Sequence, residues 1–565
     1  MSSFKAYGKV NEAEQEKLMA RRKTRRRITI ISLSSIILVA VIVAAVVGTT
    51  TNSGGKSKNA SEKAGNSVST SIKAVCDVTL YPDSCYNSLA PMVKSSRLKP
   101  EDLFNMSMEV ALNELHRTFQ RFSEYEGFKG ITDKMLAGAL DDCYELLDLA
   151  IDNLNSSLSS SLDNFDDLKT WLSAAGTYQE TCINGFESGN LRSSVLEFLK
   201  NSTEFCSNSL AIITEISKLA GSISSRRLMG LPEDKVPKWL SAKDRKLLQS
   251  SSTLKRKADA VVATDGSGKY KTISEALKAV PDKSKKSFVI YVKKGVYNEN
   301  VRVEKSKWNV LMIGDGMNTT VVSGKLNFVD GTPTFSTATF AVFGKGFVAR
   351  DMGFRNTAGA IKHQAVALMS SADQTVFYRC LIDAFQDTLY AHSQRQFYRE
   401  CDIYGTVDFI FGNSAVVFQN CNILPKQPMP GQQNTITAQG KNDPNQNTGI
   451  AIQNCTILAS ADLSSVETYL GRPWKNYSTT VYMNSMMGSL IDPAGWLPWT
   501  GTTAPNTIFY SEFKNFGPGS STKNRVKWKG LRNITQKEAS KFTVKSFIDG
   551  SEWISDAGVS FKPGL

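Results

Sequence analysis

A short aromatic, polar and cysteine pattern recurs in the C-terminal half of this chain. Its copies are Phe377-Tyr-Arg-Cys380, Phe397-Tyr-Arg-Glu-Cys401, Phe418-Gln-Asn-Cys421 and Ile452-Gln-Asn-Cys455, and the first three begin 20 and then 21 residues apart. A period of this length, in segments rich in Val, Ile, Phe and Tyr, predicts a stack of β-coils. Strands of adjacent coils lie about 4.8 Å apart, so residues one period apart become neighbours.

Two carboxylates fall one such period apart. Asp408 lies in the otherwise uncharged run 405–413, and Asp387 precedes it by 21 residues. At a separation of roughly 5 Å the two groups repel, so one of them keeps a proton. The pair can then act as nucleophile and general acid. Gln364 lies 23 residues before Asp387, again about one coil away, and Gln386 is adjacent to Asp387, so both amides can donate hydrogen bonds to an oxyanion.

Periodicity alone leaves a second interpretation open, in which the two acids reach equivalent positions by chance and face solvent. The segment Leu470-Gly-Arg-Pro-Trp474 favours the first interpretation. Arg472 is held between Gly and Pro and is suited to clamp a carboxylate, while Trp474 offers a flat apolar wall for a sugar ring.

Five segments together resemble the ordered signature motifs of plant pectin methylesterases. They are Gly295-Val-Tyr-Asn-Glu299, Gln364-Ala-Val-Ala-Leu368, Gln386-Asp-Thr-Leu389, Asp408-Phe-Ile-Phe-Gly412 and Leu470-Gly-Arg-Pro-Trp474. The resemblance covers residues 253–565. One departure is Ala384-Phe385, where the family more often has Gly-Tyr, and it concerns a subsite surface rather than the acids.

The resemblance implies a right-handed parallel β-helix that hydrolyses methyl esters of pectin. Asp408 is the expected nucleophile and Asp387 the proton donor, with Gln364 and Gln386 stabilising the oxyanion and Arg472 orienting Asp408. The implied substrate contacts are Thr334, Gln364, Arg472 and Trp474. No metal or organic cofactor is implied.

The local patterns agree with a β-helix. A short helix over Ile273 to Val280 is expected to cap one end of the stack, and short apolar strands are expected to follow at 288–292, 310–313, 347–349 and 416–418. Trp496 and Trp499 suit either sugar stacking or core packing.

Residues 71–218 have the apolar period of helices and predict an up-and-down bundle. Disulfides 76 to 85 and 143 to 182 are plausible with Cys206 left free, although other pairings are open. Cys380 and Cys401 are further disulfide candidates. The cysteine order and the segment Trp171 to Cys182 resemble the pectin methylesterase inhibitor domain, which implies a pro-region that restrains the enzyme during transit.

The N-terminal segments predict a membrane-anchored precursor. A basic cytoplasmic tail (1–27) precedes an uncharged run (28–48) long enough to span a bilayer of about 30 Å as a signal anchor. A flexible linker (49–70) follows. Between the two domains, the basic linker 219–252 carries Arg226-Arg227 and Arg245-Lys246, which are expected to be cut by a subtilisin-like protease.

The amino-acid composition limits the chemical class of the binding partner. A net charge of +14 favours a polyanion. Nine cysteines and the glycosylation sequons at Asn105, Asn201, Asn318 and Asn533 suit a secretory route, which favours an acidic wall polysaccharide over nucleic acid. Three histidines and no G-x-S-x-G motif argue against a serine triad.

Two alternative functions remain open at this point. A calcium-dependent β-helix polysaccharide lyase or hydrolase would shorten the polymer. A non-catalytic pectin-binding or inhibitor protein would need only the helical domain.

Overall fold

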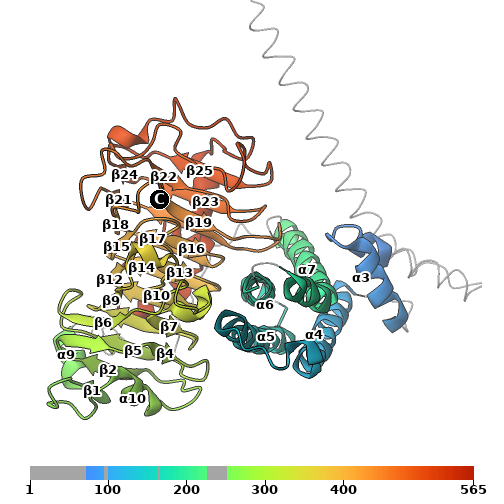
Figure 1. Ribbon diagram of the computed structural model, residues 1–565. Coiled ribbons are helices and arrows are strands. Elements are labelled where there is room, and N and C mark those ends of the chain that lie inside the picture. Colours follow the sequence, from blue (N-terminus) through green and yellow to red (C-terminus); the bar gives the residue numbers. More distant parts are fainter. Residues whose placement is uncertain (1–71, 94–98, 163, 187–188, 225–250) are drawn as a thin grey trace, which may run out of the picture. The chain divides into compact units, whose positions relative to one another are not determined.

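The computed structural model describes residues 72–93, 99–162, 164–186, 189–224 and 251–565 (Figure 1). The chain divides between residues 106 and 107 into two compact units. The expected tail, anchor and linker of residues 1–70 lie outside the described residues, and so do both dibasic sites. Among the helices that are described, none has the length and apolarity needed to cross a bilayer.

The first unit contains a short helix fixed by a disulfide. Helix α3 (Pro82–Leu89) begins with proline at its first turn, where a missing N–H is tolerated, and continues into η1 (Ala90–Met92). Cys76 and Cys85 are joined by the predicted disulfide.

Helices α5, α6 and α7 of the second unit lie side by side, with α6 between the other two (Figure 1). Asp133 caps α5 by accepting a hydrogen bond from the Leu136 N–H at 2.8 Å. The second predicted disulfide, Cys143–Cys182, joins α5 to α6, and Cys206 is a free buried thiol. The helices in this region are α4 (Pro100–Glu124), which crosses the division, η2 (Glu126–Phe128), α5 (Lys134–Leu158), α6 (Phe165–Asn184) and α7 (Asn190–Ser224).

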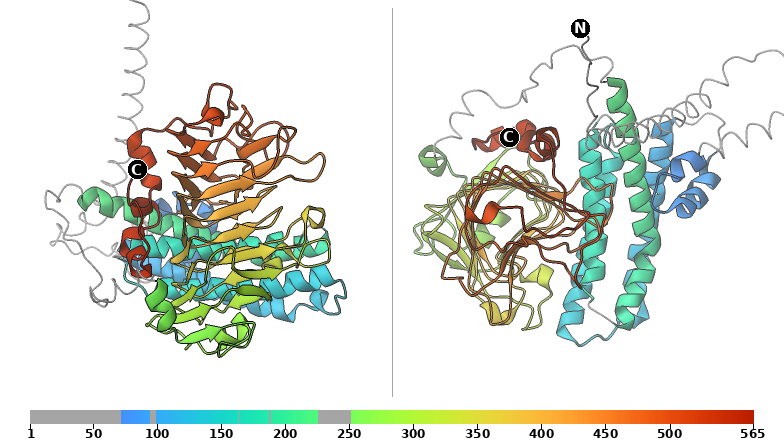
Figure 2. Two further views of the ribbon diagram at one scale, coloured as in Figure 1. Left: turned by 90° about the vertical axis from the view of Figure 1, so that its left-hand side faces the viewer. Right: turned by 90° about the horizontal axis from the view of Figure 1, so that it is seen from above.

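Residues from 260 onward form the right-handed parallel β-helix that was predicted, with one strand from each full coil in each of three parallel sheets (Figures 1 and 2). The first sheet contains β1 (Ala260–Val262), β2 (Phe288–Val292), β5 (Val310–Ile313), β8 (Val348–Arg350), β11 (Thr375–Tyr378), β14 (Arg395–Arg399), β17 (Ala415–Gln419), β20 (Gly449–Gln453), β23 (Thr479–Met483) and β25 (Phe509–Phe513). The second contains β3 (Gly295–Asn298), β6 (Thr320–Gly324), β9 (Gly353–Asn356), β12 (Leu381–Asp383), β15 (Asp402–Gly405), β18 (Asn422–Pro425), β21 (Thr456–Ile457) and β24 (Met486–Met487). The third contains β4 (Val301–Val303), β7 (Phe340–Val342), β10 (Leu368–Ser370), β13 (Leu389–Ala391), β16 (Ile410–Gly412), β19 (Asn434–Gln439) and β22 (Thr468–Gly471).

The sequence repeat marks the turn between the first two sheets. The residue before each cysteine, such as Asn420 or Asn454, has a left-handed backbone (φ 56° and 54°), which asparagine tolerates well. Inside the coil, Phe377 stacks on Tyr398 with ring centroids 4.8 Å apart. The register pairs Phe377 with Tyr398 rather than with Phe397. The copies therefore align on their cysteines, because the second copy carries one extra residue before its cysteine.

The expectation that Cys380 and Cys401 take part in disulfides is wrong. Both are free, buried thiols, in one column with Cys421 and Cys455. Equivalent positions on parallel strands lie about 4.8 Å apart with their Cα–Cβ bonds side by side, which leaves the Cβ atoms farther apart than the ~3.8 Å of a disulfide.

Helices close the end and one face of the stack. Helix α10 (Ile273–Lys278) packs its apolar side into the core beneath the first coil, as predicted, and has a capping box formed by Thr272 and Glu275. C-terminal helices cover the outer face of the first sheet. The remaining short helices are α9 (Ser251–Arg256), η3 (Thr334–Thr337), η4 (Ala360–Lys362), η5 (Pro518–Ser520), α11 (Gln536–Ala539), η6 (Ser540–Phe542), α12 (Val544–Phe547), η7 (Gly550–Glu552) and η8 (Ile554–Ala557).

Candidate active site

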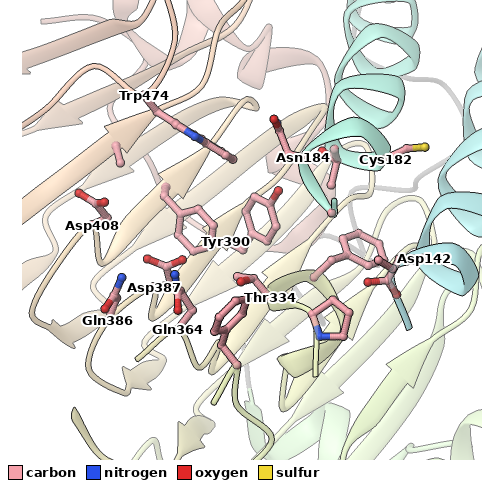
Figure 3. A pocket seen from close by; sticks show the side chains of 18 of the residues that line it. Asp142, Cys182, Asn184, Thr334, Gln364, Gln386, Asp387, Tyr390, Asp408 and Trp474 are labelled. Atoms are coloured by element: carbon pink, nitrogen blue, oxygen red, sulfur yellow. The ribbon is translucent and has the colours of Figure 1, made fainter. Parts of the chain in front are cut away.

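A cavity of about 290 Å³ lies between the third sheet and helices α5 and α6 (Figure 3). In Figure 3 the carboxyl groups of Asp387 and Asp408 and the amides of Gln364 and Gln386 lie together on one side, and Asn184 of α6 lies on the other. The β-helix residues that line the cavity are Phe328, Pro333, Thr334, Phe335, Gln364, Gln386, Asp387, Tyr390, Asp408, Phe411, Ala438, Arg472, Trp474 and Trp499. The structure thus brings together all seven residues for which the sequence predicts a catalytic or substrate-binding role.

Asp408 is held by two donors. Arg472 forms a bidentate ion pair, with Nε 2.8 Å from Oδ1 and Nη2 2.6 Å from Oδ2. The Thr435 hydroxyl donates to Oδ1 at 2.6 Å and accepts the Asp408 N–H at 2.8 Å. The carboxylate is therefore fixed in place although its side chain is only 6% exposed.

Asp387 lies one coil below Asp408. Leu389 pairs with Ile410, and the two acids stand two residues before these partners, each with a left-handed backbone (φ 59° and 51°). Burial, and then the neighbouring Asp408 carboxylate, raise the pKa of Asp387 well above its usual range, which Arg472 offsets only in part. Across the described ranges, no side chain hydrogen-bonds to the Asp387 carboxyl group. Asp387 is thus suited to hold a proton beside an ionised Asp408.

The two glutamine amides are available to a ligand. Neither side chain forms a hydrogen bond within the described part of the chain, and Oε1 of Gln364 is buried without a partner. Amides that line a cavity without internal partners can donate to a developing oxyanion.

Aromatic rings form the walls of the cavity. Tyr390 stacks on Phe411 with centroids 4.1 Å apart, and the Arg472 guanidinium lies over the Trp499 ring at 4.4 Å. Trp474 stands beside Trp499, with ring centroids 6.4 Å apart. Trp496 instead packs in the β-helix core, which separates the two tryptophans that the sequence left ambiguous.

Comparison with known proteins decides the family. Residues 259–551 match the sequence model described as Pectinesterase, and residues 70–212 match Plant invertase/pectin methylesterase inhibitor. The probable pectinesterase/pectinesterase inhibitor 46 of Arabidopsis thaliana is 57% identical over 98% of this chain and 99% of its own. The chain belongs to the pectinesterase family. Pectinesterase 3 of Phaseolus vulgaris is 50% identical over 100% of both chains. The solved pectin methylesterase from carrot is 53% identical over 55% of this chain and 98% of that one, with a TM-score of 0.54.

In this pectinesterase, the inhibitor-type helices contact the β-helix beside the cavity. The fully buried Tyr178 of α6 donates from its hydroxyl to the Ser371 carbonyl at 2.9 Å, and accepts from Ser393 Oγ at 3.0 Å and Gln394 Nε2 at 3.1 Å. On α5, Gly138 approaches Pro333 so closely that an added Cβ would lie 2.9 Å from the proline ring. Both contacts depend on close complementarity.

Ion pairs flank these contacts. Glu180 of α6 lies 2.6 Å from Lys475, and Asp167 lies 2.6 Å from the buried Arg395, which also pairs with Asp373 at 2.7 Å. If α6 moved away, the buried guanidinium of Arg395 would lose the negative charge of Asp167. This loss favours the docked state, in which α5 and α6 contact the β-helix.

The histidines do not take part in the acid pair. His392 is buried beside the cavity, between Ser371 Oγ at 2.6 Å and Thr181 Oγ1 at 2.8 Å, and burial lowers its pKa to about 3. His363 is exposed and does not line the cavity. Within the described segments, no cluster of three His, Cys, Asp or Glu side chains is arranged to hold a metal ion.

Several residues at the site were not predicted from the sequence. Tyr390 and Phe411 are one period apart in register, so the repeat that located the acids could also have found them. Thr435 stands 27 residues after Asp408, because residues 426–433 lengthen the connection from β18 to β19. A fixed 20- or 21-residue period could not have found it.

Proposed function

We propose that this pectinesterase hydrolyses the methyl esters of galacturonate units in pectin, releasing methanol and leaving a free carboxylate. The main support for the proposal is that Asp387 and Asp408 lie on adjacent coils but have different surroundings. Asp408 accepts hydrogen bonds from Arg472 and Thr435, whereas Asp387 accepts none from the described side chains and has a raised pKa.

In the first step, an Asp408 oxygen attacks the ester carbonyl carbon, and the C–O bond to the methoxy group breaks. Asp387 donates its proton to the leaving methoxide, so methanol departs and an acyl anhydride on Asp408 remains. The amides of Gln364 and Gln386 donate to the oxyanion of each tetrahedral intermediate. In the second step, ionised Asp387 takes a proton from water, whose oxygen attacks the anhydride and restores both acids.

Substrate binding follows from the charge and the aromatic surfaces around the acids. Thr334, Gln364, Arg472 and Trp474 are the proposed substrate contacts, and all line the cavity. The apolar face of a sugar ring can pack on Trp474 or Trp499. The chain's excess of positive charge suits a polymer that gains carboxylates as it is processed.

A product assay on highly methylated pectin tests the proposal. The proposed reaction yields methanol and titratable acid in equal amounts, without shortening the polymer. A calcium-dependent lyase would instead generate unsaturated sugars that absorb in the ultraviolet, and a binding protein would generate neither product.

We infer further that the inhibitor-type helices restrain the enzyme by covering the cavity. Met135, Ala139 and Asp142 of α5 and Thr181 and Asn184 of α6 line its outer side. None of the described α5 or α6 side chains hydrogen-bonds to Asp387 or Asp408. The helices therefore exclude the polymer from an acid pair that keeps its geometry.

This restraint should weaken as pH rises. Asp142 of α5 accepts a hydrogen bond from Ser336 at 2.5 Å, and burial raises its pKa from 3.8 to about 7 against the opposing effects of Ser336 and Arg302. When α5 leaves, Asp142 becomes hydrated and its pKa returns toward the ordinary value. Because the docked state has the higher pKa, its added stability is full at low pH and is lost between about pH 4 and 7.

The measurement is the rate of methanol release by the full chain, divided by that of a chain starting at Ser252. We expect this ratio to rise by more than about tenfold between pH 4 and 7. Asp142→Asn should flatten the rise, whereas Glu197→Gln, at an exposed position on α7, should not. A ratio independent of pH, or unchanged by Asp142→Asn, would contradict this role.

The secretory route of the precursor is also a proposal. It rests on the uncharged run 28–48, the two dibasic pairs and the wall location of pectin. Cleavage by a subtilisin-like protease should release an enzyme that begins near Ser250 to Ser252. N-terminal sequencing of protein extracted from cell walls checks this, and intact full-length chain at the wall would refute it.

A further inference from the structure

The column that holds the two acids continues into a third polar residue. Leu389 pairs with Ile410 and Ile410 with Thr437, so counting back two residues on each strand places Asp387, Asp408 and Thr435 on successive coils. Asp408 thus has a carboxylic acid on one side and a buried hydroxyl on the other. The two acids, although chemically alike, have different neighbours.

The Thr435 hydroxyl makes two hydrogen bonds to the same residue. It accepts the backbone N–H of Asp408 at 2.8 Å and donates to Asp408 Oδ1 at 2.6 Å. These bonds tie the side-chain rotamer of Asp408 to its left-handed backbone, a conformation that costs energy in a residue other than glycine. Thr435 itself is only 1% exposed, so water does not compete for its hydroxyl.

The donors are distributed unevenly over the carboxylate. Oδ1 accepts from both Thr435 Oγ1 and Arg472 Nε, whereas the one donor to Oδ2 among the described residues is Arg472 Nη2. A carboxylate oxygen offers about two lone-pair sites, so Oδ1 is saturated and Oδ2 keeps one free. Only Oδ2 can attack without first breaking a hydrogen bond.

We propose that Thr435 is a positioning residue that saturates Oδ1 of Asp408 and so makes Oδ2 the attacking oxygen. This rests on the proposed role of Asp408 as nucleophile. Arg472 alone cannot select between the oxygens, because its two nitrogens contact one oxygen each. Without the hydroxyl, Asp408 keeps its ion pair with Arg472 but loses the two hydrogen bonds to Thr435 that fix its orientation.

The test compares four variants of the full chain expressed in plant cells, with the enzyme extracted from the cell wall and assayed for methanol release. Thr435→Val removes the hydroxyl and keeps the shape, and Thr435→Ser keeps the hydroxyl. Thr437→Val is the matched control, since Thr437 is equally buried on the same strand and donates instead to the Leu470 carbonyl at 2.9 Å. Thr435→Ala is a second hydroxyl-free variant in case the valine does not pack.

For Thr435→Val we expect kcat to fall about 10- to 100-fold, with KM changed by less than about threefold. Thr435→Ser should stay within about threefold of the parent kcat, and Thr437→Val should lower Tm without a comparable loss of kcat. The proposal is overturned if Thr435→Val keeps the parent kcat, if serine fails to rescue, or if Thr437→Val loses as much kcat. An inactive parent enzyme would instead overturn the proposed function, which separates the two failures.

Discussion

Replacing Asp408 by Asn is expected to lower kcat on methyl-esterified pectin by at least about 10⁴-fold while the protein stays folded. The amide is nearly the same size as the carboxylate, and its single oxygen can still accept from Thr435 Oγ1 and Arg472 Nε, whereas its NH2 group cannot accept from Arg472 Nη2. It cannot form the acyl anhydride, because its nitrogen replaces one oxygen and its charge is lost. Methanol release under saturating pectin measures the effect.

The control for this variant is Asp402→Asn. Asp402 lies on β15 of the second sheet, where it accepts a hydrogen bond from Asn422 at 2.7 Å, and does not line the cavity. Its substitution should leave kcat within about twofold of the parent. Pectin binding by Asp408→Asn should also persist. If Asp408→Asn keeps more than a few per cent of the parent activity, the nucleophile is another group.

The second large effect concerns the covering helices. The full chain should release methanol from polymeric pectin at least about 100-fold more slowly than a chain starting at Ser252, which corresponds to a docked fraction of about 99 in 100. Tyr178→Ala in the full chain should raise its rate at least about tenfold, because the variant loses the three hydrogen bonds at the centre of the contact.

Two further variants separate undocking from unfolding of the helices. Gly138→Leu improves helix propensity in α5 but collides with Pro333, so it should also activate the full chain. Tyr144→Ala removes a tyrosine that packs against Phe122 within the helices and should not activate it. If Tyr144→Ala also activates the full chain, activation results from general destabilisation of the helices and not from loss of the contact with the β-helix.

The sequence repeat by itself locates much of the site. A coil of 21 residues places Asp387 beneath Asp408, and the observed register has that spacing because the β13 and β16 coils contain no inserted loop. Gln364, 23 residues before Asp387, falls about one coil away, and Gln386 is adjacent to Asp387. The short capping helix and strands β2 and β5 could also be located, since each is a compact apolar run between turn residues.

Tertiary structure alone decided the rest. The register of β16 with β19 aligns Thr435 with Asp387 and Asp408, although the connection before β19 is longer than the repeat period. Cys380 and Cys401 are free thiols because parallel stacking holds their side chains alongside one another. Trp496 and Trp499 differ in environment, because Trp496 packs in the core and Trp499 lines the cavity. A repeat in the sequence determines which coil a residue belongs to. The direction of its side chain, the length of each loop and the surface against which a helix packs are settled only when the whole chain is folded.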